Sequence, residues 1–291
     1  MARVISYYKN GNYFVKLLCD GTKIKETSED SFVAEFPDSI DLKITNYCDR
    51  GCPMCHEKSS PLGKHAELDA KFLSTLKRGT ELAIGGGNPL SHPQLIPFLE
   101  KMKKRGIVCN LTVNEEHLKS DKSLVLSLIN NKLIYGLGIS MQSYNEDAIS
   151  FALSYPHAVL HLINGVFTDY DKIADKGLKI LILGYKKFGR GEDYFNGEIA
   201  RRMNDTKKAL PTLISKFKVV SFDNLALEQL DIKSLLSPKE YEQFYMGDDG
   251  EGTMYVDLVK KEFAKSSTST ERYPILDEII PMFKKIQIIH S

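Results

Sequence analysis

The chain has 291 residues, of which 42% are apolar and 26% are charged, an ordinary composition for a globular protein that suits one α/β barrel with extensions. The 39 lysines and arginines nearly balance 38 aspartates and glutamates, and a net charge of +1 disfavours a partnership with nucleic acid. No apolar run approaches the ~18 residues that cross a bilayer, so we expect no membrane segment. The first residues lack a secretory signal, and five cysteines, three of them clustered, indicate metal chemistry in the cytoplasm.

The predicted elements fall into three parts along the chain. Residues 1–37 predict a small β meander, because Asn10-Gly11-Asn12 is a hairpin turn signal between two apolar runs. From residue 38 to 225, strand-like runs alternate with amphipathic stretches. The expected strands are residues 40–45, 81–84, 107–113, 135–141, 158–163, 178–183 and 218–222. The expected helices between them are residues 68–76, 93–104, 122–130, 145–153, 167–175 and 196–215.

Repeated strand–helix units of this length predict parallel strands joined by right-handed crossovers. The predicted fold class is therefore α/β, a partial (β/α)6-type TIM barrel with a short N-terminal β extension and a C-terminal α/β segment. A doubly wound open sheet is the alternative. Residues 226–291 break the alternation, with a helix expected at 256–265, and we expect this segment to cover the barrel opening. In either architecture, functional groups lie at the carboxyl ends of the strands.

Three cysteines, Cys48, Cys52 and Cys55, lie in a C-x3-C-x2-C run directly after the first barrel strand. Three thiolates on one loop can bind three irons of a compact cluster and leave a fourth iron open. Other interpretations remain: Cys52 to His56 matches a haem-attachment pattern, and Cys52 with Cys55 matches a thioredoxin-like pair. Zinc held by the three cysteines and His56 is a further alternative.

This spacing resembles the signature of radical S-adenosylmethionine (radical SAM) enzymes. In that family the open iron of a [4Fe–4S] cluster is chelated by the amino and carboxylate groups of SAM. The family usually has an aromatic residue before the third cysteine, where this chain has Met54. The resemblance implies that Met54 packs against the adenine.

A second match follows the next predicted strand. The family usually has Gly-Gly-Glu-Pro-Leu there, and this chain has Gly86-Gly87-Asn88-Pro89-Leu90. Glycines let the backbone approach a polar ligand closely. Asn88 replaces the glutamate that receives the ammonium group of SAM, and its carbonyl can accept that bond without charge assistance.

Softer matches lie at later strand ends, where the resemblance implies contacts with SAM from Thr112, Ser140, Gln142 and Gly184. An ordinary polar strand terminus is an equal alternative for each. We predict that Asp223 and Tyr255 take part in catalysis at the substrate end of the site. Other residues that follow late strands or lie in the C-terminal segment are expected nearby: Tyr185, Lys186, Lys187, Arg190, Asn224 and Met254.

The resemblance implies an enzyme with one [4Fe–4S] cluster and SAM as cofactors. Reductive cleavage of SAM would give a 5′-deoxyadenosyl radical that abstracts hydrogen from a small-molecule or peptide substrate. A flavodoxin or ferredoxin would donate the electron. The reaction class stays open between oxidoreductase, transferase and isomerase. The rival functions are a zinc-stapled binding protein without catalysis and an RNA-modifying radical SAM enzyme, which the balanced charge disfavours.

Overall fold

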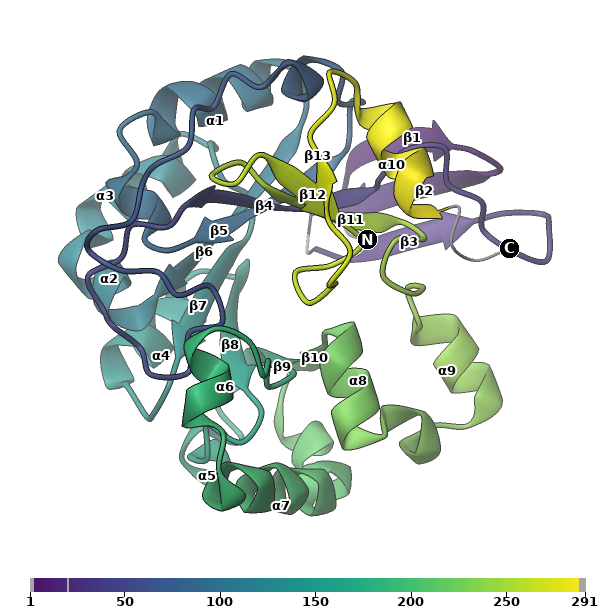
Figure 1. Ribbon diagram of the computed structural model, residues 1–291. Coiled ribbons are helices and arrows are strands. Elements are labelled where there is room, and N and C mark those ends of the chain that lie inside the picture. The colour runs from purple at the N-terminus through teal and green to yellow at the C-terminus, as the bar shows by residue number, and fades with distance from the viewer. Residues whose placement is uncertain (1–2, 20, 288–291) are drawn as a thin grey trace.

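The computed structural model describes residues 3–19 and 21–287. Within them a sheet of parallel strands curves into an open barrel, with helices along its outer face (Figure 1). The repeating strands are β4 (Ser39–Thr45), β5 (Glu81–Gly86), β6 (Val108–Asn114), β7 (Leu137–Met141), β8 (Ala158–Ile163), β9 (Lys179–Leu183) and β10 (Val219–Phe222). They are hydrogen-bonded in chain order, each parallel to the next. The predicted α/β class and partial barrel are confirmed, including the strand expected at 218–222.

Helices follow most of these strands, as right-handed crossovers require. The α-helices are α1 (Leu95–Lys104), α2 (Glu115–Ser120), α3 (Lys122–Asn130), α4 (Glu146–Ser154), α5 (Tyr170–Ile173), α6 (Arg190–Tyr194), α7 (Gly197–Leu213), α8 (Asn224–Leu230), α9 (Pro238–Phe244) and α10 (Ile279–Gln287). Short 3₁₀ turns are η1 (Lys71–Ser74), η2 (Pro89–Ser91), η3 (Ile214–Lys216) and η4 (Ile232–Leu235). The helix expected at 68–76 is only the η1 turn, because the Phe72 carbonyl accepts from the backbone N–H and the hydroxyl of Thr75, three residues on, as in a 3₁₀ turn.

The N-terminal extension is an antiparallel sheet of β1 (Val4–Asn10), β2 (Tyr13–Leu18) and β3 (Lys23–Glu26). The turn between β1 and β2 contains Gly11, as expected. The hydroxyl of Tyr135, at the amino end of β7, donates to the Leu18 carbonyl at 2.8 Å. This extension therefore lies against the amino-terminal end of the barrel.

The C-terminal segment joins the barrel sheet through β11 (Thr253–Asp257), which pairs parallel to β4. Two antiparallel strands, β12 (Glu262–Ala264) and β13 (Tyr273–Pro274), continue the sheet (Figure 1). The helix predicted at 256–265 is therefore wrong. Met254 and Val256 are fully buried while Tyr255 and Asp257 meet polar partners, and this period of two fits a strand. The domain limits at residues 37 and 225 stay predictions, and residues 1–2 and 288–291 of the end segments lie outside the described part.

The two faces of the sheet differ in composition. The outer face buries large apolar side chains such as Leu42, Ile84 and Leu111 beneath the helices. The inner face encloses a cavity of about 450 Å³. Small and polar groups line it together with larger apolar ones: Ala83, Asn110, Thr112, Gly138, His161 and Ser221 beside Leu17, Tyr135, Val159, Leu181 and Val219. A closed barrel fills its interior with bulky branched residues, whereas this open barrel leaves a cavity on the inner face of its sheet, which we call the lumen.

Candidate functional site

The cysteine loop leaves the carboxyl end of β4 and is closed at its base by backbone hydrogen bonds. Asn46 N donates to the Lys64 carbonyl at 2.9 Å, and Cys48 N donates to the Ser60 carbonyl at 3.0 Å. A tight turn inside the loop joins Cys55 N to the Cys52 carbonyl at 3.2 Å. Backbone hydrogen bonds thus hold the loop together at its base.

The three thiols of this loop are free and half-buried. Burial raises the pKa of Cys48, and charge on Cys52 and Cys55 raises it further, so the three sulfurs share one electrostatic site. A tetrahedral zinc ion with bonds of about 2.3 Å holds thiolate sulfurs roughly 3.8 Å apart. Among the described residues, the group of potential ligands within 4.8 Å of one another contains Cys48 with Asp49 and His117, not the three cysteines.

The wider separation of the thiols fits a cluster, in which each thiolate binds a different iron. His56 is absent from that group of close ligand atoms as well, and its Nε2 lies 3.5 Å from the Glu57 carboxylate. The donor set of three thiols from one loop therefore fits an iron–sulfur cluster better than a single zinc ion.

The glycine turn after β5 is joined directly to the start of the cysteine loop. Gly87 N donates to the Thr45 carbonyl at 2.8 Å, and Asn88 N donates to the Tyr47 carbonyl at 2.6 Å. A Cβ on Gly87 would lie 2.1 Å from the Tyr47 oxygen, and Gly86 has a φ of +117°. Glycine is needed here so that the two motifs can pack backbone against backbone.

Gly85, by contrast, faces open space, since a Cβ there would meet nothing within 4 Å. Asn88 is buried and its Oδ1 accepts from Leu90 N at 3.1 Å, which caps the η2 turn that begins at Pro89. The amide of Asn88 therefore has a structural role, and its predicted contact with SAM stays a prediction.

Side chains from distant elements fix the cysteine loop from outside. Arg190, at the start of α6, donates from Nε to the Cys52 carbonyl at 3.0 Å and from Nη1 to the Ser59 carbonyl at 2.9 Å. His117 of α2 is buried, and its Nε2 lies 2.6 Å from the Asp49 carboxylate. Both contacts hold the loop in place, which the sequence did not predict for either residue.

Gln142, which directly follows β7, reaches the cysteine loop itself. Its side-chain Nε2 donates to the Cys52 sulfur at 3.0 Å, and its backbone N donates to Glu115 Oε1 at 3.1 Å. Glu115 is buried at the start of α2, and burial raises its pKa even though the bond from Gln142 lowers it. The sequence predicted Gln142 in the site, and the structure adds its contact with a cysteine.

A buried ionic network joins the cysteine loop to β4 and β11. Lys43 pairs with Glu57 of the loop and, at 2.9 Å, with Asp257. The hydroxyl of Tyr255 donates to the other Glu57 oxygen at 2.9 Å. Burial raises the pKa of Glu57, but His56 and Lys43 outweigh this and lower it overall. Tyr255 is thus a partner of the loop, and its predicted catalytic role stays a prediction.

Asp41, two residues before Lys43 on the same face of β4, is accessible and has no hydrogen-bond or ion-pair partner among the described residues. Burial within the barrel raises its pKa to about 6, Lys186 opposes that rise, and Asp249 and Asp223 add to it. The side chain of Asp41 is thus accessible to solvent, although it lies deep within the protein. His161 lines the lumen, and burial lowers the pKa of its imidazole to about 4, so the ring is neutral.

The remaining predicted residues divide into lumen and scaffold positions. Thr112 lines the lumen, and Ser140 is aligned with Asn114 and His161 across neighbouring strands. Met54 packs into an apolar cluster with Tyr185 and Ile199, so its contact with adenine stays a prediction.

Asp223 caps α8, since its Oδ1 accepts at 2.8 Å from both Gly184 N and Ala226 N. Its carboxylate nevertheless acts on Asp41 through charge. Two further predicted residues are tied to the C-terminal segment, because Lys186 donates to Ser267 at 2.8 Å and Asn224 donates to Asp249 at 2.8 Å. Several of the predicted substrate-end residues are therefore held by protein partners, and Met254 is buried in the apolar core. Their place at the substrate end stays a prediction.

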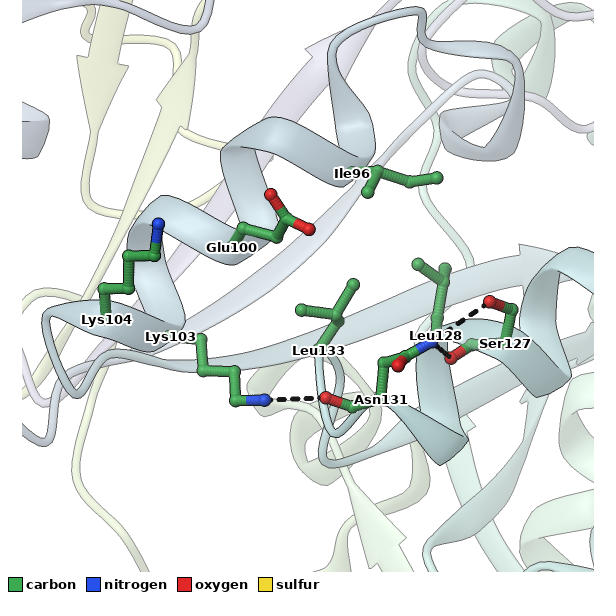
Figure 2. A pocket seen from close by; sticks show the side chains of 8 residues that line it. All are labelled: Ile96, Glu100, Lys103, Lys104, Ser127, Leu128, Asn131 and Leu133. Carbon is green, nitrogen blue, oxygen red and sulfur yellow. Dashed lines mark hydrogen bonds between the residues drawn. The ribbon is translucent and has the colours of Figure 1, made fainter.

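Another hollow, of about 510 Å³, lies on the outer helical layer between α1 and the end of α3 (Figure 2). Lys103 crosses it and donates to the Asn131 carbonyl at 2.7 Å. None of the predicted site residues lines this hollow. This hollow is therefore separate from the candidate functional site.

The structure is an open α/β barrel with the cysteine loop at the carboxyl ends of its strands, and this fold matches the partial barrel of radical SAM enzymes. Among solved structures it resembles Streptococcus suis SuiB bound to S-adenosylmethionine, with a TM-score of 0.55 and 13% identity over 89% of this chain and 67% of that chain. SuiB crystallised with the precursor peptide SuiA gives a TM-score of 0.54 and 14% identity over 79% and 60%. A third structure, of SuiB, gives a TM-score of 0.54 and 15% identity over 89% of this chain and 67% of that chain.

At these identities the similarity establishes the fold alone, and this chain spans 60% to 67% of the length of the SuiB chains. No protein-family model and no curated protein matches the sequence. Among the described residues, no helix is both long and apolar enough to cross a membrane.

The sequence analysis did not predict Asp41, Lys43 or His161 as residues of the site. The available signal was alternation: charged residues interrupt the apolar run at every second position in Ile40-Asp41-Leu42-Lys43-Ile44, and His161 interrupts another strand in the same way. In a strand with period two, such residues share one face. A polar face on a parallel strand predicts a ligand-binding lumen.

Proposed function

We propose that the protein is a radical SAM enzyme that holds one [4Fe–4S] cluster on Cys48, Cys52 and Cys55. The observation that carries this proposal is the direct backbone contact between the cysteine loop and the glycine turn at the carboxyl ends of the barrel strands. When bound, the cluster would supply the electron that cleaves SAM to methionine and a 5′-deoxyadenosyl radical, which abstracts hydrogen from the substrate.

The chain's own residues bind and orient the reactants. The three thiols leave one iron for SAM, and the turn from Gly86 to Pro89 would receive its methionine end beside that iron. Backbone groups can approach closely there, because Gly85 leaves open space next to the turn. We propose that Thr112, Ser140 and Gly184 lie along the cofactor and Met54 near its adenine.

The lumen would hold the substrate away from bulk water, which a reactive radical requires. We propose that Asp223 and Tyr255 act at this substrate end; the charge of Asp223 on Asp41 and the pairing of β11 with β4 support this. A peptide is the favoured substrate because SuiB binds a precursor peptide. A small molecule remains the alternative.

We also propose a flavodoxin- or ferredoxin-type electron donor and a cytoplasmic location. The free thiols of the described cysteines suit such a reducing compartment. The cysteine loop is partly exposed at Asp49, Arg50 and Gly51, so a donor can approach it closely.

The test is an anaerobic assay with iron- and sulfide-reconstituted protein, dithionite and SAM, in which 5′-deoxyadenosine is measured. Wild type should form it, and Cys52→Ala should lose at least nine-tenths of the product because one cluster ligand is missing. Cys19→Ala, in the N-terminal extension, is the matched cysteine control and should retain wild-type formation. A wild-type protein that holds iron but forms no 5′-deoxyadenosine would contradict the proposal.

A further inference from the structure

Gln142 is a side chain from outside the cysteine loop that contacts one of its sulfurs. Its Nε2 lies 3.0 Å from the Cys52 sulfur, within hydrogen-bonding distance. An amide nitrogen can only donate. The contact is therefore an N–H···S hydrogen bond whose strength depends on the negative charge on the sulfur.

The position of Gln142 is fixed independently of that bond. It directly follows β7, whose residues pair with both β6 and β8 in the middle of the sheet. Its backbone N–H is held by Glu115. Because that contact involves the backbone, replacing the side chain of Gln142 removes the bond to sulfur and leaves the anchor intact.

From this geometry we propose that Gln142 raises the reduction potential of the cluster by donating a hydrogen bond to the Cys52 thiolate. The inference rests on the proposed function, since it concerns the cluster that the three cysteines would hold. Reduction adds one electron, and part of its charge falls on the thiolate ligands. A donor to sulfur therefore stabilises the reduced state more than the oxidised state.

The other sulfurs of the loop offer a useful contrast. Cys48 receives its hydrogen bond from the backbone of Arg50, which no substitution of a side chain removes. A hydrogen bond donated by a side chain, in contrast, can be removed by a substitution that leaves the backbone of the loop in place. Gln142 is thus a positioning residue that acts through Cys52 on electron transfer, in addition to any contact that it makes with SAM.

The experiment is a reductive titration of the reconstituted protein, followed by electron paramagnetic resonance and visible absorption, for wild type, Gln142→Met and Gln142→Glu. Methionine has a similar length and no donor. We expect the ratio of reduced to oxidised cluster at a fixed ambient potential to fall about tenfold in Gln142→Met, which corresponds to about 59 mV for one electron. Gln142→Glu should shift at least as far in the same direction, because its negative charge opposes reduction.

Gln94→Met is the matched control, since Gln94 is exposed ahead of α1 and should keep the wild-type potential. Variants that load iron normally and titrate with the wild-type potential would overturn the inference and leave the proposed function standing. Loss of iron from both Gln142 variants would also overturn it, because the amide would then hold the loop rather than set its potential. A wild-type protein without a cluster would instead refute the proposed function.

Discussion

At the scale of single residues, the site depends on charges placed on the inner face of β4. Lys43 is 2% exposed and lies between Glu57 and Asp257, which are 16% and 2% exposed. Its own pKa is raised, because the two carboxylates outweigh the effect of burial. One lysine thus connects the cysteine loop, the first barrel strand and the C-terminal segment.

Replacing Lys43 by methionine should leave two buried carboxylates without their cation. Breaking such a buried network by removing one partner costs about 3–5 kcal/mol of unfolding free energy. Chemical denaturation of the apoprotein measures the loss. Lys71→Met is the matched control, because Lys71 and Asp277 are 77% and 72% exposed and such pairs contribute at most about 1 kcal/mol. Equal stabilities of the two variants would contradict the role of the network.

The carboxylate of Asp41 gives a prediction on pH. Its pKa rises from 3.8 to about 6 in the folded protein, so the folded state binds the proton more tightly than the unfolded state does. Ionised Asp41 therefore opposes folding, and this penalty develops as the pH rises through that interval. Asp41→Asn should raise the melting temperature at pH 7 to 8, with the difference vanishing below pH 3.8. A difference in melting temperature between Asp41→Asn and wild type that does not change with pH would contradict this prediction.

At the scale of elements, the joint between the glycine turn and the cysteine loop controls the mouth. Gly87→Ala puts a Cβ against the Tyr47 carbonyl oxygen, and backbone cannot move aside cheaply. Such overpacking costs about 1–3 kcal/mol. We expect a lower melting temperature together with reduced iron content after reconstitution.

Gly85→Ala is the matched control for the glycine turn, because its Cβ meets nothing within 4 Å. It should preserve both the melting temperature and the iron content. If Gly87→Ala behaves like Gly85→Ala in both measurements, the two motifs do not depend on their close approach.

At the scale of the whole molecule, local patterns predicted the barrel well because its strands alternate regularly with helices. The strand expected at 218–222 is present as β10, although it is short and partly exposed. The segment after residue 250 was harder, because its pairing partner β4 lies more than two hundred residues earlier. A helix predicted from local pattern at 256–265 gives way to a strand that covers the open edge of β4.

In the candidate site, too, residues with a local sequence signal were predicted and long-range contacts were not. The cysteines and glycines carry local signals, so the sequence identified them. The contacts of Arg190 and His117 with the loop join residues 138 and 68 positions apart. No local pattern contains such a distance. The same holds for Gln142, whose place near the cofactor was expected but whose bond to Cys52 was not.

The central claim is that three thiols at the mouth of the barrel hold a cluster with one open iron. Iron and sulfide analysis of the anaerobically reconstituted protein, with paramagnetic resonance of the reduced form before and after addition of SAM, tests it most directly. We predict about four irons and four sulfides per chain, and a spectrum that changes when SAM binds the open iron. One zinc ion per chain, or a cluster whose spectrum SAM leaves unchanged, would contradict the claim.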